Sequence, residues 1–95
     1  MKSKTLNNTS FEEVKQNVSD VQSKGDPNTF RLICKAWSKS EGWMKSTKAM
    51  EISNIGCIIQ VTTQQDTQVA EALTFVPGVR LQEKEDGTIR IVRLY

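Results

Sequence analysis

Residues 30–63, FRLICKAWSKSEGWMKSTKAMEISNIGCIIQVTT, decide the predicted fold of this chain. Three strand-like runs follow one another here, and short polar segments containing Ser, Gly and Asn separate them. The stretch also holds both tryptophans, both cysteines and the densest basic charge. The other predicted elements are therefore placed around three consecutive strands.

The first run, residues 30–38, alternates between two faces, as a strand does. The face predicted to lie in the core carries Phe30, Leu32, Cys34 and Ala36. The opposite face carries Arg31, Ile33, Lys35, Trp37 and Lys39. The third run is rich in β-branched residues, and it is predicted to extend the core with Cys57, Ile59 and Val61.

The second run, residues 43–52, has two mixed faces, so its buried side stays open. Met50 and Ile52 favour burial of the even-numbered residues. Turns are predicted on both sides of this run, at residues 38–42 and 53–56. The three runs can therefore follow one another as an antiparallel meander.

A helix is predicted to begin at Ser10. The sequence Ser10-Phe11-Glu12-Glu13 matches a capping box, in which the Ser hydroxyl and the Glu13 carboxylate satisfy free backbone N–H groups. The apolar residues that follow recur at helical spacing, at Phe11, Val14, Val18 and Val21. Gly25 and the Asp26-Pro27 pair end the predicted helix.

A second helix is predicted over residues 69–76, because Val69, Leu73 and Val76 recur at helical spacing. Asp66 or Thr67 would cap its start, and Pro77-Gly78 would end it. A strand over residues 72–76 is the alternative interpretation of the same segment.

A hairpin is predicted over residues 79–95, because Asp86-Gly87 is typical of a type I′ turn. A two-residue loop places Glu83 opposite Arg90, which pairs opposite charges across the strands. A three-residue loop is the alternative.

The two-residue loop leaves Ile89 and Ile91 on the face opposite the apolar one. Their position indicates either a sheet covered on both faces or a subunit contact. The three-residue loop would instead bury Ile91 and expose Val92.

The predicted fold class is therefore α+β. A single antiparallel sheet of about five strands, in the order α-β-β-β-α-β-β, carries two helices packed on one face. Residues 1–9 are polar and without period, and they are predicted to form a flexible tail. Residues 10–95 are predicted to form one domain.

Composition narrows the chemistry. The chain has no histidine, which removes catalysis that uses an imidazole base and metal sites that use an imidazole ligand. Its two cysteines lie in apolar runs and are expected to be buried and reduced. No apolar run is long enough to span a membrane, and the N-terminus lacks a signal peptide. We expect a cytoplasmic protein that is not an enzyme and has no cofactor, metal or membrane partner.

Charge is distributed unevenly although the net charge is only +2. Residues 30–50 contain five basic residues and one acidic residue, whereas residues 51–77 contain three acidic residues and no basic one. Basic and aromatic residues together suit single-stranded nucleic acid, since bases stack on rings and phosphates need cations. The candidate nucleic-acid contacts are Arg31, Lys35, Trp37, Lys39, Trp43, Lys45 and Lys48.

A protein–protein interaction module is the preferred functional hypothesis, with self-association through a sheet face or edge included. It rests on apolar residues at positions that the predicted core does not claim. These candidate partner contacts are Ile33, Trp37, Trp43, Ile89 and Ile91. Binding of single-stranded nucleic acid is the alternative. Small chains of this kind are common among accessory proteins of phages and mobile elements, which is a general expectation about size.

Overall fold

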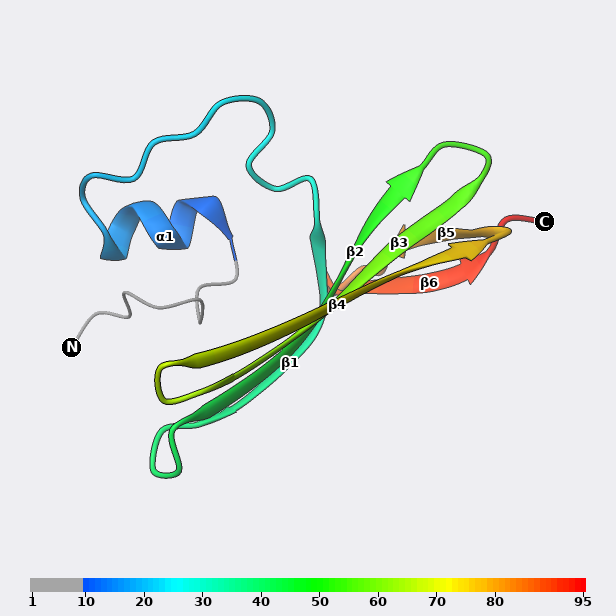
Figure 1. Ribbon diagram of the computed structural model, residues 1–95. Helices are drawn as coiled ribbons and strands as arrows, with labels where there is room; N and C mark the ends of the chain where they lie inside the picture. The colour runs from blue at the N-terminus through cyan, green and yellow to red at the C-terminus, as the bar shows by residue number, and fades with distance from the viewer. Residues whose placement is uncertain (1–9) are drawn as a thin grey trace.

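The computed structural model describes residues 10–95, and the predicted tail at residues 1–9 lies outside the described residues. A ribbon view shows a long twisted sheet with a short helix to one side and a hairpin at one end (Figure 1). The elements in chain order are α1 (Phe11–Asn17), β1 (Arg31–Ser38), β2 (Trp43–Ile52), β3 (Gly56–Gln65), β4 (Gln68–Pro77), β5 (Val79–Glu83) and β6 (Ile89–Arg93).

The strands of the described chain form two sheets. Four strands form an antiparallel meander in the order β1-β2-β3-β4, and β5 pairs with β6 in a separate two-stranded sheet. The predicted α+β class, with two helices on one five-stranded sheet, is therefore wrong. The protein is mostly β, and the one helix in residues 10–95 has seven residues. That helix is too short to cross a membrane.

The predicted second helix is strand β4. Gln65 and Gln68 pair across a two-residue loop, and Asp66 adopts φ 54°, so the loop returns the chain alongside β3 instead of starting a helix. From Val69 onward, odd-numbered residues share one face. The helical spacing of Val69 and Leu73 is equally a strand spacing, since four residues are two strand periods. Residues 68–77 form a strand and not a helix because they pair with β3 along their whole length.

Helix α1 begins where the capping box predicts, because the Ser10 hydroxyl accepts a hydrogen bond from the Glu13 amide at 3.2 Å. It ends earlier than predicted, at Asn17, and Val18 is already extended. Asn, Ser, Asp and β-branched Val are weak helix formers, and no residue of α1 is buried. Short helices without a packed face are marginal, so the predicted continuation to Val21 does not form.

A bulge in β1 changes which residues point to which face. The β1–β2 register shifts between Leu32 and Cys34, so Leu32 pairs with Lys48 while Cys34 pairs with Thr47. The side chains therefore change face within one strand. The predicted common core face of the first strand is wrong for this reason, and Cys34 and Ala36 are exposed.

The four-stranded sheet has two differently covered faces. The helix face contains Met44, Ser46 and Lys48 of β2, and a hollow of about 300 Å³ between Lys48 and α1 marks where the helix lies over it. The hairpin face contains the odd-numbered residues of β2. Both faces bury part of β2, with Met44 buried on the helix face and Ala49 on the hairpin face.

The β5–β6 hairpin covers one end of the hairpin face. The Leu81 amide donates to the Glu51 carboxylate at 2.7 Å, and the Cys57 Sγ lies 3.8 Å from the Val79 carbonyl oxygen. Glu51 and Cys57 are partners across β2 and β3, so both contacts start from one place on the sheet. Cys57 is fully buried, as predicted, beneath this hairpin.

The hairpin has the three-residue loop, so the predicted two-residue register is wrong. Glu83 pairs with Ile89 instead of Arg90, and the Lys84 amide donates to the Thr88 carbonyl at 2.8 Å. Asp86 stabilises this longer loop because its Oδ1 accepts hydrogen bonds from the amide and the hydroxyl of Thr88, at 3.0 and 2.6 Å. Gly87 at φ 84° supplies the left-handed residue that such loops require.

The burial of the hairpin residues also differs from what the sequence suggested for a three-residue loop, which was a buried Ile91 and an exposed Val92. Ile89 is the buried residue, Ile91 is exposed and Val92 is half-buried. Ile89 therefore belongs to the core between the hairpin and the sheet.

Gly56 lies close against the backbone of β4. A Cβ at this position would clash with the Val76 carbonyl oxygen, and it would lie 2.8 Å from Pro77 Cα and 3.1 Å from the Phe75 ring. Gly56 pairs with Pro77 at the end of β3–β4, so the absence of a side chain lets the chain turn into β5.

We expect Gly56→Ala to lower the free energy of unfolding by about 1–3 kcal/mol, because backbone atoms must move to make room for the methyl group. Urea unfolding followed by circular dichroism measures this. Ser53→Ala, at an exposed position in the preceding turn, is the control and should unfold like the parent. Equal midpoints for Gly56→Ala and Ser53→Ala would contradict the close approach.

Candidate interaction surface

The five predicted partner contacts do not form one surface. Trp37 lies on the helix face and is 54% exposed, whereas Trp43 lies on the hairpin face and is half-buried. Ile33 sits at the β1 bulge and is half-buried, Ile89 is in the core, and Ile91 is exposed on the hairpin. The structure leaves Trp37 and Ile91 as exposed members of the set, on different sheets.

The predicted nucleic-acid contacts are divided between the two faces. Lys35, Trp37 and Lys48 lie on the helix face, and Arg31, Trp43 and Lys45 lie on the hairpin face, with Lys39 in the turn. The bulge is the cause, since Arg31 and Lys35 would share a face in a regular strand.

Lys35 is already engaged within the chain. Its Nζ lies 5.4 Å from the centre of the Trp37 ring, which is a cation–π contact. Desolvation lowers the pKa of Lys35, and Lys48 lowers it further, although the Glu13 carboxylate opposes both. The stripe that alternation predicted is therefore two smaller groups on opposite faces.

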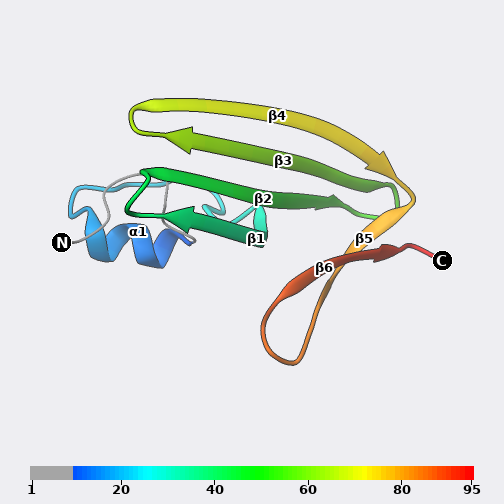
Figure 2. The same cartoon turned by 90° about the horizontal axis from the view of Figure 1, so that it is seen from below.

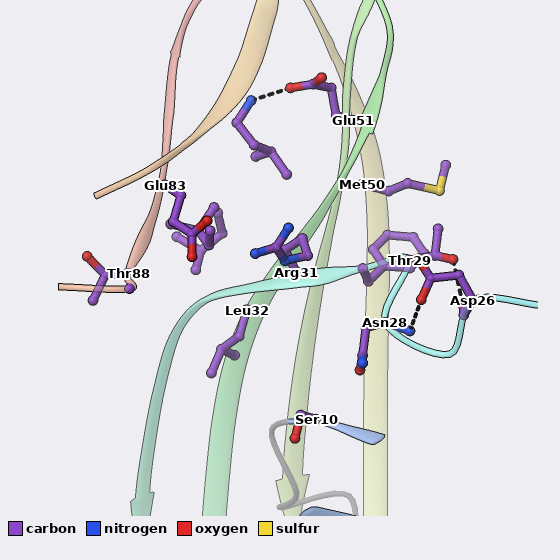
Figure 3. A pocket seen from close by; sticks show the side chains of 15 residues that line it. Ser10, Asp26, Asn28, Thr29, Arg31, Leu32, Met50, Glu51, Glu83 and Thr88 are labelled. Atoms are coloured by element: carbon purple, nitrogen blue, oxygen red, sulfur yellow. Dashed lines mark hydrogen bonds between the residues drawn. The ribbon is translucent and has the colours of Figure 1, made fainter. Parts of the chain in front are cut away.

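A groove of about 890 Å³ lies between the segment before β1, strand β2 and the β5–β6 hairpin. Arg31, Met50 and Glu51 lie on one side of it and Glu83 and Thr88 on the other (Figure 3). The Glu51 carboxylate accepts a hydrogen bond from the Leu81 backbone N–H.

Two other polar side chains of this groove also make internal bonds. The Asn28 Oδ1 accepts a hydrogen bond from the backbone N–H of Phe11 at 3.0 Å. The Asp26 Oδ1 accepts a hydrogen bond from the backbone N–H of Asn28 at 2.9 Å. Within residues 10–95, no three metal-ligating side chains gather. The groove therefore lies where these parts of the fold meet, and the groups named here bond within the chain.

A second hollow, of about 220 Å³, lies near both tryptophans at the turn end of the sheet. Gln64 and Asp66 also line it, and the Gln64 Oε1 is buried with no hydrogen-bond partner in the described part of the chain. Among residues 10–95, it is the one buried polar side-chain atom without a hydrogen-bond partner.

Strand β4 is the most exposed apolar element of the described chain. Nine of its ten residues are exposed. On the helix face, Val69 is 46%, Leu73 63% and Phe75 47% exposed, and Val61 of the adjacent β3 is 43% exposed on the other face. The sequence signal was present in the alternation of Val69, Leu73 and Phe75, but the helical interpretation concealed it.

The outer edge of β4 is also unpaired. Among residues 10–95, β3 is the one strand that pairs with β4, so one side of its backbone has no strand partner. Figure 2 shows β4 along one border of the molecule, with α1 and the body of the hairpin displaced toward the β1 side. A long, apolar and uncovered edge strand is a site for pairing with another chain.

The opposite edge of the same sheet is protected. Strand β1 carries Arg31 and Lys35, contains the bulge and lies near β6. Charges, bulges and covering elements are the devices by which proteins prevent edge pairing. Between residues 68 and 76, β4 has no lysine, arginine or bulge. The two edges therefore differ in the features that govern association.

The fold and this surface define a small antiparallel β protein with one protected and one unprotected sheet edge. The chain belongs to the Lockin family, whose model matches residues 1–92. Neither the comparison with curated proteins nor the comparison with solved structures found a match.

The two cysteines differ in environment, since Cys34 is exposed and Cys57 is buried. We expect one thiol to react at once with an aromatic disulfide reagent and the second to react only on unfolding. Cys34→Ser should remove the fast phase and Cys57→Ser the slow one. Equal reaction rates for both thiols in the folded protein would contradict the structure.

Burial raises the pKa of the Cys57 thiol, and the nearby Glu51 carboxylate raises it further. The folded protein therefore retains this proton to higher pH than the unfolded chain, so the stabilisation is complete below the ordinary thiol pKa. We expect the free energy of unfolding to fall as the pH rises through and above that range. The fall should be shallower in Cys57→Ala, as measured by urea unfolding at successive pH values. An identical pH slope for both proteins would argue against a buried thiol at this position.

Proposed function

We propose that this protein is a non-enzymatic protein–protein interaction module that binds its partner through the outer edge of β4. The observation that carries this is an edge strand with three apolar side chains, Val69, Leu73 and Phe75, each exposed by nearly half or more. The same sheet protects its other edge with charge and a bulge.

Binding by strand addition fits this surface. A partner strand would form main-chain hydrogen bonds with β4, and its side chains would cover the exposed apolar residues of the helix face. Each well-made hydrogen bond contributes about 0.5–1.5 kcal/mol and each fully buried apolar side chain about 1.5–3 kcal/mol. Several such contacts along ten residues are enough for specific association.

The sequence supports a role without catalysis, since the chain contains no histidine, and Asp26, Asn28 and Glu51 of the large groove accept hydrogen bonds from backbone N–H groups of the chain. Two free cysteines, one of them exposed, suit a reducing compartment, so we propose the cytoplasm. Single-stranded nucleic acid is a weaker candidate, because the predicted contacts are divided into two smaller groups on opposite faces.

A photo-crosslinking amino acid in place of Leu73 tests the proposal in cells that express the full chain. We expect covalent adducts with protein at this position, because its side chain is 63% exposed beside the unpaired edge. The same amino acid in place of Ala36, exposed on the protected β1 edge, is the control and should give few adducts. Equal yields at the two positions, or no protein adduct at Leu73, would overturn the proposal.

A further inference from the structure

We propose that the partner of β4 is the β4 strand of a second copy of this chain, in an antiparallel pair with Val69 opposite Phe75. This inference rests on the proposed function and names its partner. It makes the two four-stranded sheets of a dimer one continuous sheet, related by a two-fold axis through Ala72.

The backbone positions that can pair follow from the β3–β4 loop. Gln65 and Gln68 close a two-residue loop, and such a closing pair is hydrogen-bonded. Alternate residues of an antiparallel strand direct their N–H and C=O groups to opposite sides. Counting from Gln68, the groups that point to the open edge belong to Val69, Glu71, Leu73, Phe75 and Pro77. Pro77 has no N–H, so four residues offer both a donor and an acceptor there.

Three two-fold registers are possible near the centre of these residues. They differ in which side chains and backbone donors they place opposite each other. Glu71 opposite Glu71 places like charges in direct opposition, which is destabilising. Leu73 opposite Leu73 places Val69 opposite Pro77, which cannot donate. Glu71 opposite Leu73 places Val69 opposite Phe75. This register uses all four donors of each strand and separates the two carboxylates.

Side chains on both faces fit this register. On the helix face, Val69 and Phe75 meet twice, so the most exposed aromatic of β4 is covered by a β-branched partner. Glu71 is directed inward, since its Oε1 accepts from the Thr62 hydroxyl at 3.4 Å. On the hairpin face, Ala72 meets Ala72, and two small side chains suit the close approach of a non-hydrogen-bonded pair.

The assembly closes after two copies. The four-stranded sheet of each chain offers one unprotected edge, and its β1 edge carries Arg31, Lys35 and the bulge. Pairing of β4 with β4 uses the unprotected edge of both copies, so this sheet offers no further open edge from which a fibre could extend. The net charge of +2 per chain opposes this association only weakly.

Sedimentation of the full chain over a dilution series tests the dimer. We expect a dimer that dissociates on dilution, and Leu73→Pro should weaken it at least roughly tenfold, because it removes an edge donor from each strand. The Leu73 amide points away from β3, so this proline leaves the β3–β4 pairing intact. Leu73→Val keeps the amide and is the matched control. Circular dichroism and cooperative unfolding confirm that each variant is folded.

Cysteine substitution in a Cys34→Ser background tests the register. Facing residues of a non-hydrogen-bonded pair have Cα atoms about 4.5 Å apart, which is within the range of a disulfide. Ala72→Cys should therefore give a disulfide-linked dimer with oxidised glutathione, whereas Ala70→Cys and Thr74→Cys alone should not. Mixing the Ala70→Cys and Thr74→Cys chains should give the linked heterodimer, since these positions face each other.

The outcomes separate this inference from the proposed function. A monomer at every concentration, a dimer unaffected by Leu73→Pro, or equal cross-linking at positions 70, 72 and 74 would overturn the β4–β4 pair. A monomer that still gives adducts with a different protein at Leu73 would overturn the pair and leave the proposed function standing. A dimer in which Ala72→Cys is the one single variant of the three that cross-links supports both the β4–β4 pair and the proposed function.

Discussion

A strand at the edge of a sheet leaves half of its backbone N–H and C=O groups without a strand partner, and this constraint dominates the present fold. A four-stranded meander has two such edges, and the described chain covers neither with a helix. Strand β1 meets the constraint with charge and a bulge, which turn its side chains away from a regular ladder. Strand β4 has no lysine, arginine or bulge, its one charged side chain is Glu71, and its apolar residues remain exposed. The difference between the two edges is the basis of the functional proposal.

Local chemistry predicted the parts of the fold that local chemistry controls. The Ser10 cap, the turn after Ser38 and the turn before Gly56 lie where the sequence indicates, because cap and turn residues act over a few positions. The predicted length of α1 and the predicted loop of the last hairpin were wrong. The length of α1 depends on a competition between weak helix formers and extended chain. The hairpin loop depends on a competition between the Asp86 side-chain hydrogen bonds and a shorter turn.

Strand β4 was mistaken for a helix because tertiary pairing overrode an ambiguous pattern. Residues four apart share a face in both structures, so Val69 and Leu73 could not distinguish them. The exposed apolar residues of β4 were absent from the predicted contacts for the same reason, since they lay in the misassigned segment. The predicted basic and aromatic stripe is divided between two faces for another reason. A bulge between Leu32 and Cys34 exchanges faces, and alternation of residue types does not reveal where a bulge occurs.

The small core gives the open edge a second consequence. Among residues 10–95, the apolar residues buried almost completely are Met44, Ala49, Cys57 and Ile89, and two of these side chains are small. A chain of this size gains most of its stability from apolar burial and has little to spare. Covering Val69, Leu73 and Phe75 in a β4–β4 pair would add buried area comparable in kind to the core itself. Because only the folded chain presents this edge, association would draw the folding equilibrium toward the native state. In the proposed pair, stability and assembly would be coupled through one strand.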